Sequence, residues 1–70
     1  MESYITIYIN GEPFNCYHKM SLQDLLLYLG FDLNSIIIEY NKQILSFSQY
    51  VDILLSEKDS IEIINIVGGG

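Results

Sequence analysis

Three consecutive glycines, Gly68, Gly69 and Gly70, stand last in the sequence and are the residues best suited to chemistry. Glycine loses more backbone freedom on folding than any other residue, so such a tract does not stabilise a fold. Three extended residues span about 10 Å and carry no side chains, which lets them enter a narrow active site. We therefore expect modification at the carboxylate of Gly70, with Gly68 and Gly69 as the tail that enters a partner's active site. The alternative is a frayed terminus without function.

A carboxylate is inert toward acyl transfer until it is activated, and adenylation by ATP is the usual biological activation. The enzyme that performs it supplies magnesium and positive groups that stabilise the charge at phosphorus. This sequence contains no P-loop, dinucleotide fingerprint or zinc-ligand spacing. We therefore expect that the chain binds no cofactor or metal, and that ATP and Mg are used by the activating partner.

Other reactive side chains are few. His18 is the sole histidine and stands in a polar connection, where a solvated surface residue is expected. Cys16 is expected to be a small buried hydrophobe, because a reactive thiol needs an electropositive setting. Glu57, Asp59 and Glu62 flank a turn without calcium-loop spacing and are expected to be solvated. No catalytic residue is predicted, so the chain is expected to be acted upon by enzymes.

Composition indicates one small globular domain. The chain has 70 residues, of which 50% are hydrophobic, and a net charge of −6 from nine acidic and three basic residues. Nucleic-acid binding is excluded because it needs clustered Lys or Arg, and a membrane span needs about 20 consecutive apolar residues. The start shows no secretory signal, and the single cysteine fits a reducing compartment. The lack of Ala and Arg is typical of an AT-rich genome, so we expect the cytoplasm, or the stroma if the chain is plastid-encoded.

Alternating and helical patterns predict the elements that position the tail. Residues 4–9 alternate as a strand with its isoleucines toward the core, and Asn10-Gly11 predicts a hairpin into a strand over 12–17. Pro13 places that second strand at a sheet edge. A helix over 21–31 follows; its N-cap is Ser21, its leucines form one apolar stripe, and Gly30 stands at its end.

The second half predicts three further strands. Residues 36–45 form a hairpin around Asn41-Lys42, and 61–67 form an apolar last strand. Between them, Tyr50, Val51, Leu54 and Leu55 line a short helical turn or belong to a loop laid on the core.

The order of elements predicts an α+β fold with a mixed sheet of four to five strands packed on one main helix. The apolar last strand suits the sheet centre, beside and parallel to the first strand. This arrangement is the ubiquitin-like β-grasp. We predict a single β-grasp domain over residues 1–67 and a flexible glycine tail over 68–70.

A β-grasp pattern with a Gly-Gly terminus resembles the ubiquitin-like sulfur carriers, and most closely the ThiS family of thiamine thiazole biosynthesis. The resemblance runs end to end. It rests on "INGEPFNC" for the first hairpin, "SLQDLLLYLGFD" for the helix, "IIIEYNKQILSFSQY" for the central hairpin and following turn, and "EKDSIEIINIVGGG" for the last strand and terminus.

The resemblance implies a reaction cycle in which the chain is a protein co-substrate and not an enzyme. A ThiF-type adenylyltransferase would convert Gly70 to an acyl-adenylate. A persulfide sulfur from a cysteine desulfurase or persulfide carrier would displace AMP and leave a thiocarboxylate. A ThiG-type thiazole synthase would then accept the sulfur. Two alternatives stay open: a carrier of the molybdopterin synthase small-subunit type, which is usually longer, and a non-catalytic β-grasp interaction module.

The sequence departs from the family pattern after the helix. Asn41-Lys42 replaces the usual Asn-Gly, at some cost in turn stability, and the basic residues common after that hairpin are missing. If the first strand turns its isoleucines toward the helix, then Tyr4, Thr6 and Tyr8 face outward. We expect this exposed aromatic surface to dock a partner protein.

Overall fold

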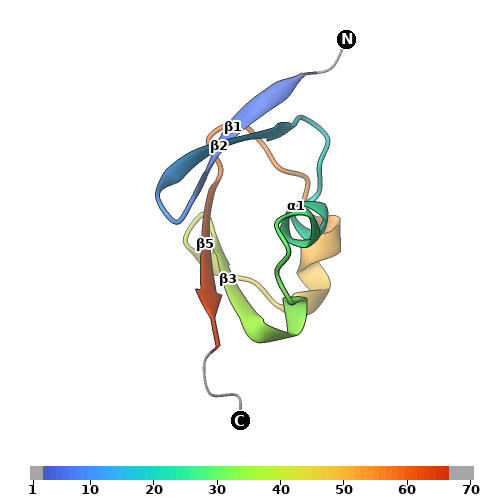
Figure 1. Ribbon diagram of the computed structural model, residues 1–70, viewed down its shortest axis with the longest axis vertical. Coiled ribbons are helices and arrows are strands. Elements are labelled where there is room, and N and C mark those ends of the chain that lie inside the picture. Colours follow the sequence, from blue (N-terminus) through green and yellow to red (C-terminus); the bar gives the residue numbers. More distant parts are fainter. Residues whose placement is uncertain (1–2, 67–70) are drawn as a thin grey trace.

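The computed structural model describes residues 3–66, which form a five-stranded sheet packed against one α-helix. In Figure 1 the strands stand on one side of the molecule and helix α1 on the other. The elements in chain order are β1 (Tyr4–Ile9), β2 (Glu12–Tyr17), α1 (Leu22–Tyr28), η1 (Leu33–Ser35), β3 (Ile36–Tyr40), β4 (Gln43–Ile44), η2 (Phe47–Asp52) and β5 (Ser60–Asn65).

Strand β5 occupies the centre of the sheet, whose order is β2-β1-β5-β3-β4. It runs parallel to β1, with Ile9 beside Ile61, and antiparallel to β3, with Ile38 beside Ile63. The predicted β-grasp topology is therefore confirmed, including the central position of the last strand.

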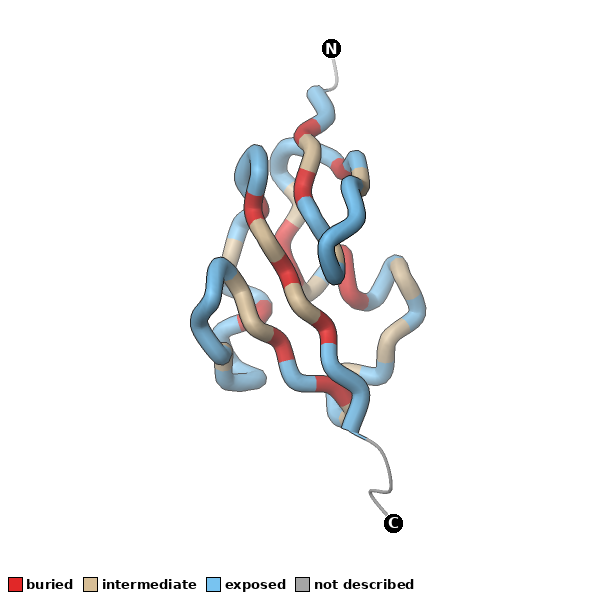
Figure 2. The backbone as a smooth tube through the Cα atoms, turned by 90° about the vertical axis from the view of Figure 1, so that its left-hand side faces the viewer, coloured by how far each residue is buried: buried red, intermediate tan, exposed pale blue. Residues whose placement is uncertain are grey.

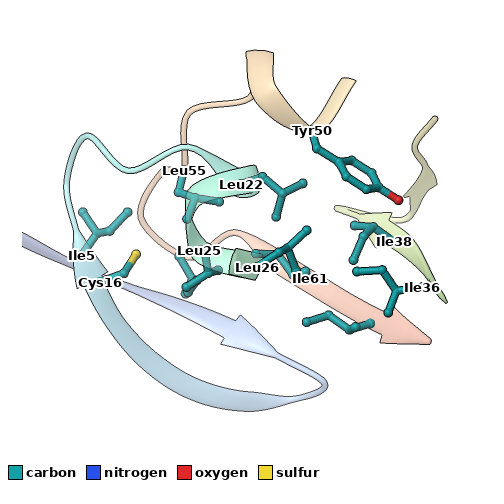
Figure 3. Close-up of a cluster of buried hydrophobic side chains, with 12 residues drawn as sticks. Ile5, Cys16, Leu22, Leu25, Leu26, Ile36, Ile38, Tyr50, Leu55 and Ile61 are labelled. Atoms are coloured by element: carbon teal, nitrogen blue, oxygen red, sulfur yellow. The ribbon is translucent and has the colours of Figure 1, made fainter. Parts of the chain in front are cut away.

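The core lies between the sheet and α1 and is built almost entirely from isoleucine and leucine. Figure 3 shows these side chains converging from the helix and the inner face of the sheet. Complete burial of such a side chain contributes about 2 kcal/mol to the hydrophobic free energy of folding. The largest side chains with no residual exposure are Ile7, Leu22, Leu25, Leu26, Ile38 and Ile61.

Both ends of α1 are capped as the sequence predicted. The Ser21 hydroxyl oxygen accepts a hydrogen bond from the backbone N–H of Asp24 at 3.0 Å. At the other end Gly30 has φ of +87°, and the N–H of Phe31 donates to the carbonyl of Leu26 at 3.0 Å. This is the Schellman arrangement, which satisfies carbonyls that the helix leaves without an intrahelical partner.

Strand β2 is an edge strand, as Pro13 predicted. Pro13 is the register partner of Tyr8, and the backbone N–H of Tyr8 points to the opposite side, where it donates to the carbonyl of Asp59 at 2.8 Å. The backbone nitrogen of Pro13 therefore faces away from β1. The lack of an N–H at this position removes no hydrogen bond between the two strands.

The segment after β4 matches neither arrangement predicted for its four apolar residues, which were expected to line one face of a helical turn or to lie on the core as part of a loop. Tyr50 in η2 and Leu55 beyond it are buried, whereas Val51 and Leu54 are 55% and 62% exposed. The short helical turn ends at Asp52, and in the extended chain that follows, Leu54 and Leu55 point to opposite sides. Only half of the predicted apolar face therefore enters the core.

The turn between β3 and β4 contains a strained lysine. Asn41 and Lys42 have φ of +47° and +72°, as the two central residues of a type I′ hairpin turn require. Asparagine tolerates this region, but a lysine carries a steric cost of about 1 kcal/mol there. The corresponding turn between β1 and β2 places Gly11 at that position, with φ of +84°.

We predict that Lys42→Gly raises the free energy of unfolding by about 0.5–1 kcal/mol, because glycine adopts positive φ without the clash. Urea unfolding followed by circular dichroism measures the change. Lys42→Gln is the matched control, since it removes the charge and keeps the Cβ atom. An equal gain in both variants would show that charge, and not backbone strain, limits the turn.

Candidate functional site

The predicted chemistry lies beyond the end of β5. Gly68, Gly69 and Gly70 lie outside the described residues, so their roles as tail and modification site stay predictions. The last described residue, Ile66, has its backbone N–H bonded to the carbonyl of Ser35 at 2.8 Å. Strand β5 runs toward the end of the molecule opposite the start of β1 (Figure 1). The tail therefore starts from a segment held by hydrogen bonds up to its last described residue.

Two turn asparagines hold β5 from opposite sides. Strand β1 turns back after Ile9, and the Asn10 side-chain oxygen accepts from the N–H of Ile63 at 2.7 Å in its place. On the other side, the Asn41 side-chain oxygen accepts from the N–H of Ser60 at 2.8 Å. Each asparagine thus supplies an acceptor that the neighbouring strand does not provide, which extends the ladder around β5.

Asp59, directly before β5, is the buried centre of a partly exposed polar cluster. Its carboxylate accepts hydrogen bonds from the Tyr40 hydroxyl at 2.5 Å, the Asn41 amide at 3.1 Å and the backbone N–H of Ser56 at 2.8 Å. The residue is only 7% exposed, so the prediction that it is solvated is wrong. These three hydrogen-bond donors replace the water molecules that the carboxylate loses when it is buried.

The neighbouring acidic residues also differ from a purely solvated turn. Glu57 is exposed as expected, but its carboxylate accepts from the backbone N–H of Thr6 at 3.1 Å and so closes the start of β1 onto this turn. Glu62 lies within β5 and is partly buried. Local sequence does not reveal the contact of Glu57, because Thr6 is 51 residues away in the chain.

Burial and the neighbouring Asp59 carboxylate raise the pKa of Tyr40 from 10.0 to about 12. Burial is the larger cause, followed by the hydrogen bond and the negative charge, all of which oppose ionisation of the phenol. The hydroxyl therefore stays protonated and keeps donating to Asp59 throughout the neutral range.

We predict that this cluster makes stability fall between pH 10 and pH 12. Because the folded pKa lies above the unfolded value, the contribution of Tyr40 is complete below pH 10 and is lost as pH rises through 12; its size is about 2 kcal/mol. Thermal unfolding across this range measures it. Tyr40→Phe should be less stable at pH 8 and should lose this part of the pH dependence.

Tyr28→Phe is the matched control for that experiment, because Tyr28 is 74% exposed. It should keep the wild-type alkaline profile. An unchanged profile in Tyr40→Phe would contradict the assignment of the loss to the Tyr40–Asp59 pair.

The predicted outward-facing residues of β1 do lie on the sheet face away from α1. Tyr4 is 61% exposed and Tyr8 36% exposed, while Thr6 is partly buried. The Tyr4 ring stacks on Tyr17 at a centroid distance of 5.0 Å, and the Thr6 hydroxyl donates to the Asn15 side chain at 2.8 Å. Their orientation is confirmed, and their role in docking stays a prediction.

Cys16 and His18 occupy the environments expected for residues without catalytic roles. Cys16 is 4% exposed, and burial, with the charges of Asp59 and Glu57, raises the pKa of its thiol. A thiolate is therefore disfavoured at this position. His18 is exposed. Within residues 3–66 no group of three metal-ligating side chains is assembled, and no helix is both long and apolar enough to span a membrane.

A mixed five-stranded sheet with a central last strand and one packed helix defines a ubiquitin-like β-grasp protein. Its structure superimposes on that of thiamine biosynthesis protein ThiS from Geobacter metallireducens with a TM-score of 0.80, covering 94% of this chain and 100% of that one. Sequence identity is 20%, so this match concerns the fold.

The sequence places the chain more narrowly, because the ThiS family model matches residues 7–70. The chain belongs to the ThiS family. It is 38% identical over 50 residues to sulfur carrier protein ThiS from Bacillus subtilis, covering 71% of this chain and 76% of that protein. The predicted family and its sulfur-carrier function in thiamine biosynthesis are thereby confirmed.

Two further relatives differ in length. An uncharacterized protein, ycf40, from Porphyra purpurea is 48% identical over 66 residues, which is 94% of this chain and 93% of that protein. Thiazole synthase from Magnetococcus marinus is 39% identical over 64 residues. That match covers 91% of this chain but only 20% of the larger protein.

Proposed function

We propose that this chain carries sulfur as a thiocarboxylate on Gly70 and delivers it for thiazole formation in thiamine biosynthesis. The observation that carries the proposal is the ThiS family match, which extends over residues 7–70 and so includes the glycine tail. In the proposed cycle Gly70 is the single modified residue, and Gly68 and Gly69 are the passage into the partner's active site.

Sulfur is loaded onto Gly70 in three steps. The carboxylate attacks the α-phosphorus of ATP and releases pyrophosphate, which makes an acyl-adenylate. A persulfide sulfur then attacks the acyl carbon and expels AMP, leaving an acyl disulfide. A thiol cleaves that disulfide and releases the thiocarboxylate, whose sulfur is a soft, ionised nucleophile at neutral pH. ATP and Mg are used by the activating enzyme, so the chain itself needs no cofactor.

The β-grasp domain serves in this cycle as a rigid base for the tail. Asn10 and Asn41 bond to β5 on its two sides, and the N–H of Ile66 bonds to Ser35. A fixed base limits the volume that the short tail samples and raises the effective concentration of Gly70 at a docked enzyme's active site. The chain is therefore a protein co-substrate and not an enzyme.

Three partners follow from this role: a ThiF-type adenylyltransferase, a sulfur donor, and a ThiG-type thiazole synthase. The Magnetococcus protein supports the last of these, because a segment similar to this chain makes up about a fifth of a protein named thiazole synthase. The sulfur donor is a cysteine desulfurase or a persulfide carrier. No nucleic acid or membrane takes part in the proposed cycle.

The proposed location is the cytoplasm, or the plastid stroma if the chain is plastid-encoded. The absence of Ala and Arg beside abundant Ile, Asn and Tyr supports an AT-rich genome. Near full-length similarity to proteins named ycf40 is consistent with that origin. The ThiS family match favours thiazole formation over the molybdopterin pathway and over an inert interaction module.

Intact-mass measurement tests the proposal. After incubation with a ThiF-type adenylyltransferase, ATP and a persulfide donor, the mass should rise by the difference between sulfur and oxygen. Deletion of Gly70 should abolish this product and leave the thermal unfolding midpoint unchanged, because terminal residues contribute little to stability. No mass change in the folded wild-type chain would refute the carrier role.

A second assay separates the two carrier pathways. The loaded chain should support formation of thiazole phosphate by thiazole synthase and should not support molybdopterin formation. The reverse result would assign the chain to the molybdopterin route.

A further inference from the structure

The end of β5 from which the tail starts is held differently from the middle of the strand. The register of β1 with β5 ends at Ile61, and the Asn10 side chain reaches only as far as the N–H of Ile63. Residues 64–66 are all exposed, so burial of their side chains contributes little to holding them. Figure 2 shows this change: buried and intermediate residues alternate along β5 and give way to exposed ones. These last residues therefore depend on backbone bonds to the chain on the β3 side.

A single backbone hydrogen bond joins Ile66 to Ser35, which lies directly before β3. The two residues continue the antiparallel register in which Ile36 lies beside Asn65, and the N–H of Ile66 donates to the carbonyl of Ser35 at 2.8 Å. In a regular ladder such a pair exchanges two hydrogen bonds. Here the N–H of Ser35 donates instead to the carbonyl of Asp32 at 2.9 Å. The last contact before the tail thus rests on the Ser35 carbonyl.

The carboxylate of Asp32 fixes the turn that carries this carbonyl. Asp32 is the N-cap of η1, and its Oδ1 accepts a hydrogen bond from the backbone N–H of Asn34 at 3.0 Å. Its Oδ2 accepts one from the Ser35 hydroxyl, also at 3.0 Å. An N-cap carboxylate satisfies donors that the first turn leaves without a partner. Asp32 therefore sets the position of the Ser35 carbonyl, and through it the point at which the chain leaves the sheet.

Opening of the Ser35–Ile66 bond would lengthen the tail. Four residues follow Ile66, and they span about 14 Å at full extension. Without this bond, the next residue of β5 that the ladder holds is Ile64, the register partner of Ile37, and the six residues that follow it span about 21 Å. Effective concentration at a target site falls roughly as the −3/2 power of the length of the connecting chain, which gives about a twofold loss here.

We propose that Asp32 is a positioning residue for the adenylation of Gly70. The proposal rests on the proposed sulfur-carrier function. Asp32 acts through Ser35 and Ile66, and it fixes both the starting point and the length of the tail that the adenylyltransferase receives.

The kinetics of adenylation distinguish this role from a structural one. The chain is a co-substrate of the adenylyltransferase, so a variant that unfolds reduces the amount of competent substrate and raises the apparent KM. A longer tail leaves docking unchanged but lowers the fraction of docked complexes in which Gly70 occupies the active site, which lowers kcat. Asp32→Ala should therefore lower kcat about two- to threefold and leave KM unchanged.

Two measurements on the purified chain test the proposal. The rate of pyrophosphate exchange into ATP, measured with a ThiF-type adenylyltransferase over a range of carrier concentrations, gives kcat and KM. Amide hydrogen exchange followed by NMR reports the anchor itself. In Asp32→Ala the Ile66 amide should exchange about tenfold faster than in the wild type, because local opening becomes easier. The amide of Ile63, which is held by Asn10, should keep its wild-type rate.

Four further variants separate capping, charge and tail length. Asp32→Asn should keep nearly the wild-type kcat, because asparagine is as good an N-cap as aspartate. Asp24→Ala is the charge control, since Asp24 is also exposed and lies in the first turn of α1; it should keep the wild-type kcat. Ser35→Ala, which removes only the hydroxyl bond, should change kcat less than Asp32→Ala does. Two glycines inserted after Val67 should lower kcat without faster exchange at Ile66.

Other outcomes overturn the proposal. An unchanged Ile66 exchange rate in Asp32→Ala would show that Asp32 does not hold this bond. Faster exchange with unchanged kcat would show that the anchor does not limit adenylation. A raised KM with unchanged kcat would assign Asp32 to stability alone, and an equal loss in Asp24→Ala would assign the effect to charge. Failure of the proposed function is distinct, because the wild type would then not be adenylated at all.

Discussion

The structure depends on the hydrogen bonds that hold the central strand β5 where the neighbouring strands β1 and β3 turn away from it. Strand β1 turns away after Ile9 while the parallel β5 continues, and the antiparallel β3 turns away after Tyr40, beside the start of β5. Asn10 and Asn41, one in each turn, use their side-chain oxygens as acceptors for backbone N–H groups of β5. The two hairpin turns thus connect strands and also complete the sheet around the strand that leads to the tail.

This double use of the turns explains why their conformation matters. An asparagine at positive φ presents both its backbone and its side chain to β5: the backbone N–H groups of Asn10 and Asn41 donate to the carbonyls of Ile61 and Ser60. Asp59 then joins the second turn to the loop before β5. Strain at Lys42 is tolerated because the residue beside it is fixed by these long-range bonds.

Sequence patterns predicted what is local or periodic. The isoleucines of β1, the caps of α1, the edge position of Pro13 and the central position of β5 all follow from alternation, capping residues and ring chemistry. Burial of Asp59 was not predictable in this way, because its donors lie on Tyr40 and Asn41, far away in the chain. The sequence also did not predict which apolar residues of segment 47–55 are buried, because a short helical turn followed by extended chain has no single period.

The candidate site shows the same division between local and long-range features. The role of its glycines was predicted from residue type and from the family resemblance, and it stays a prediction. The exposed residues of the outer sheet face depend on register: Ile37 meets Ile64, and Glu39 meets Glu62, only once β3 and β5 are paired. A string of isoleucines on both faces of a strand does not show which of them is left uncovered.

The central place of β5 also has a mechanical consequence. A strand bonded on both sides and pulled along its own axis loads its hydrogen bonds in shear, so they resist together, whereas an edge strand can be peeled away one bond at a time. An enzyme that draws the tail into its channel pulls β5 in the shearing direction. In the proposed cycle, the domain would thus withstand traction on its terminus while an enzyme acts on Gly70.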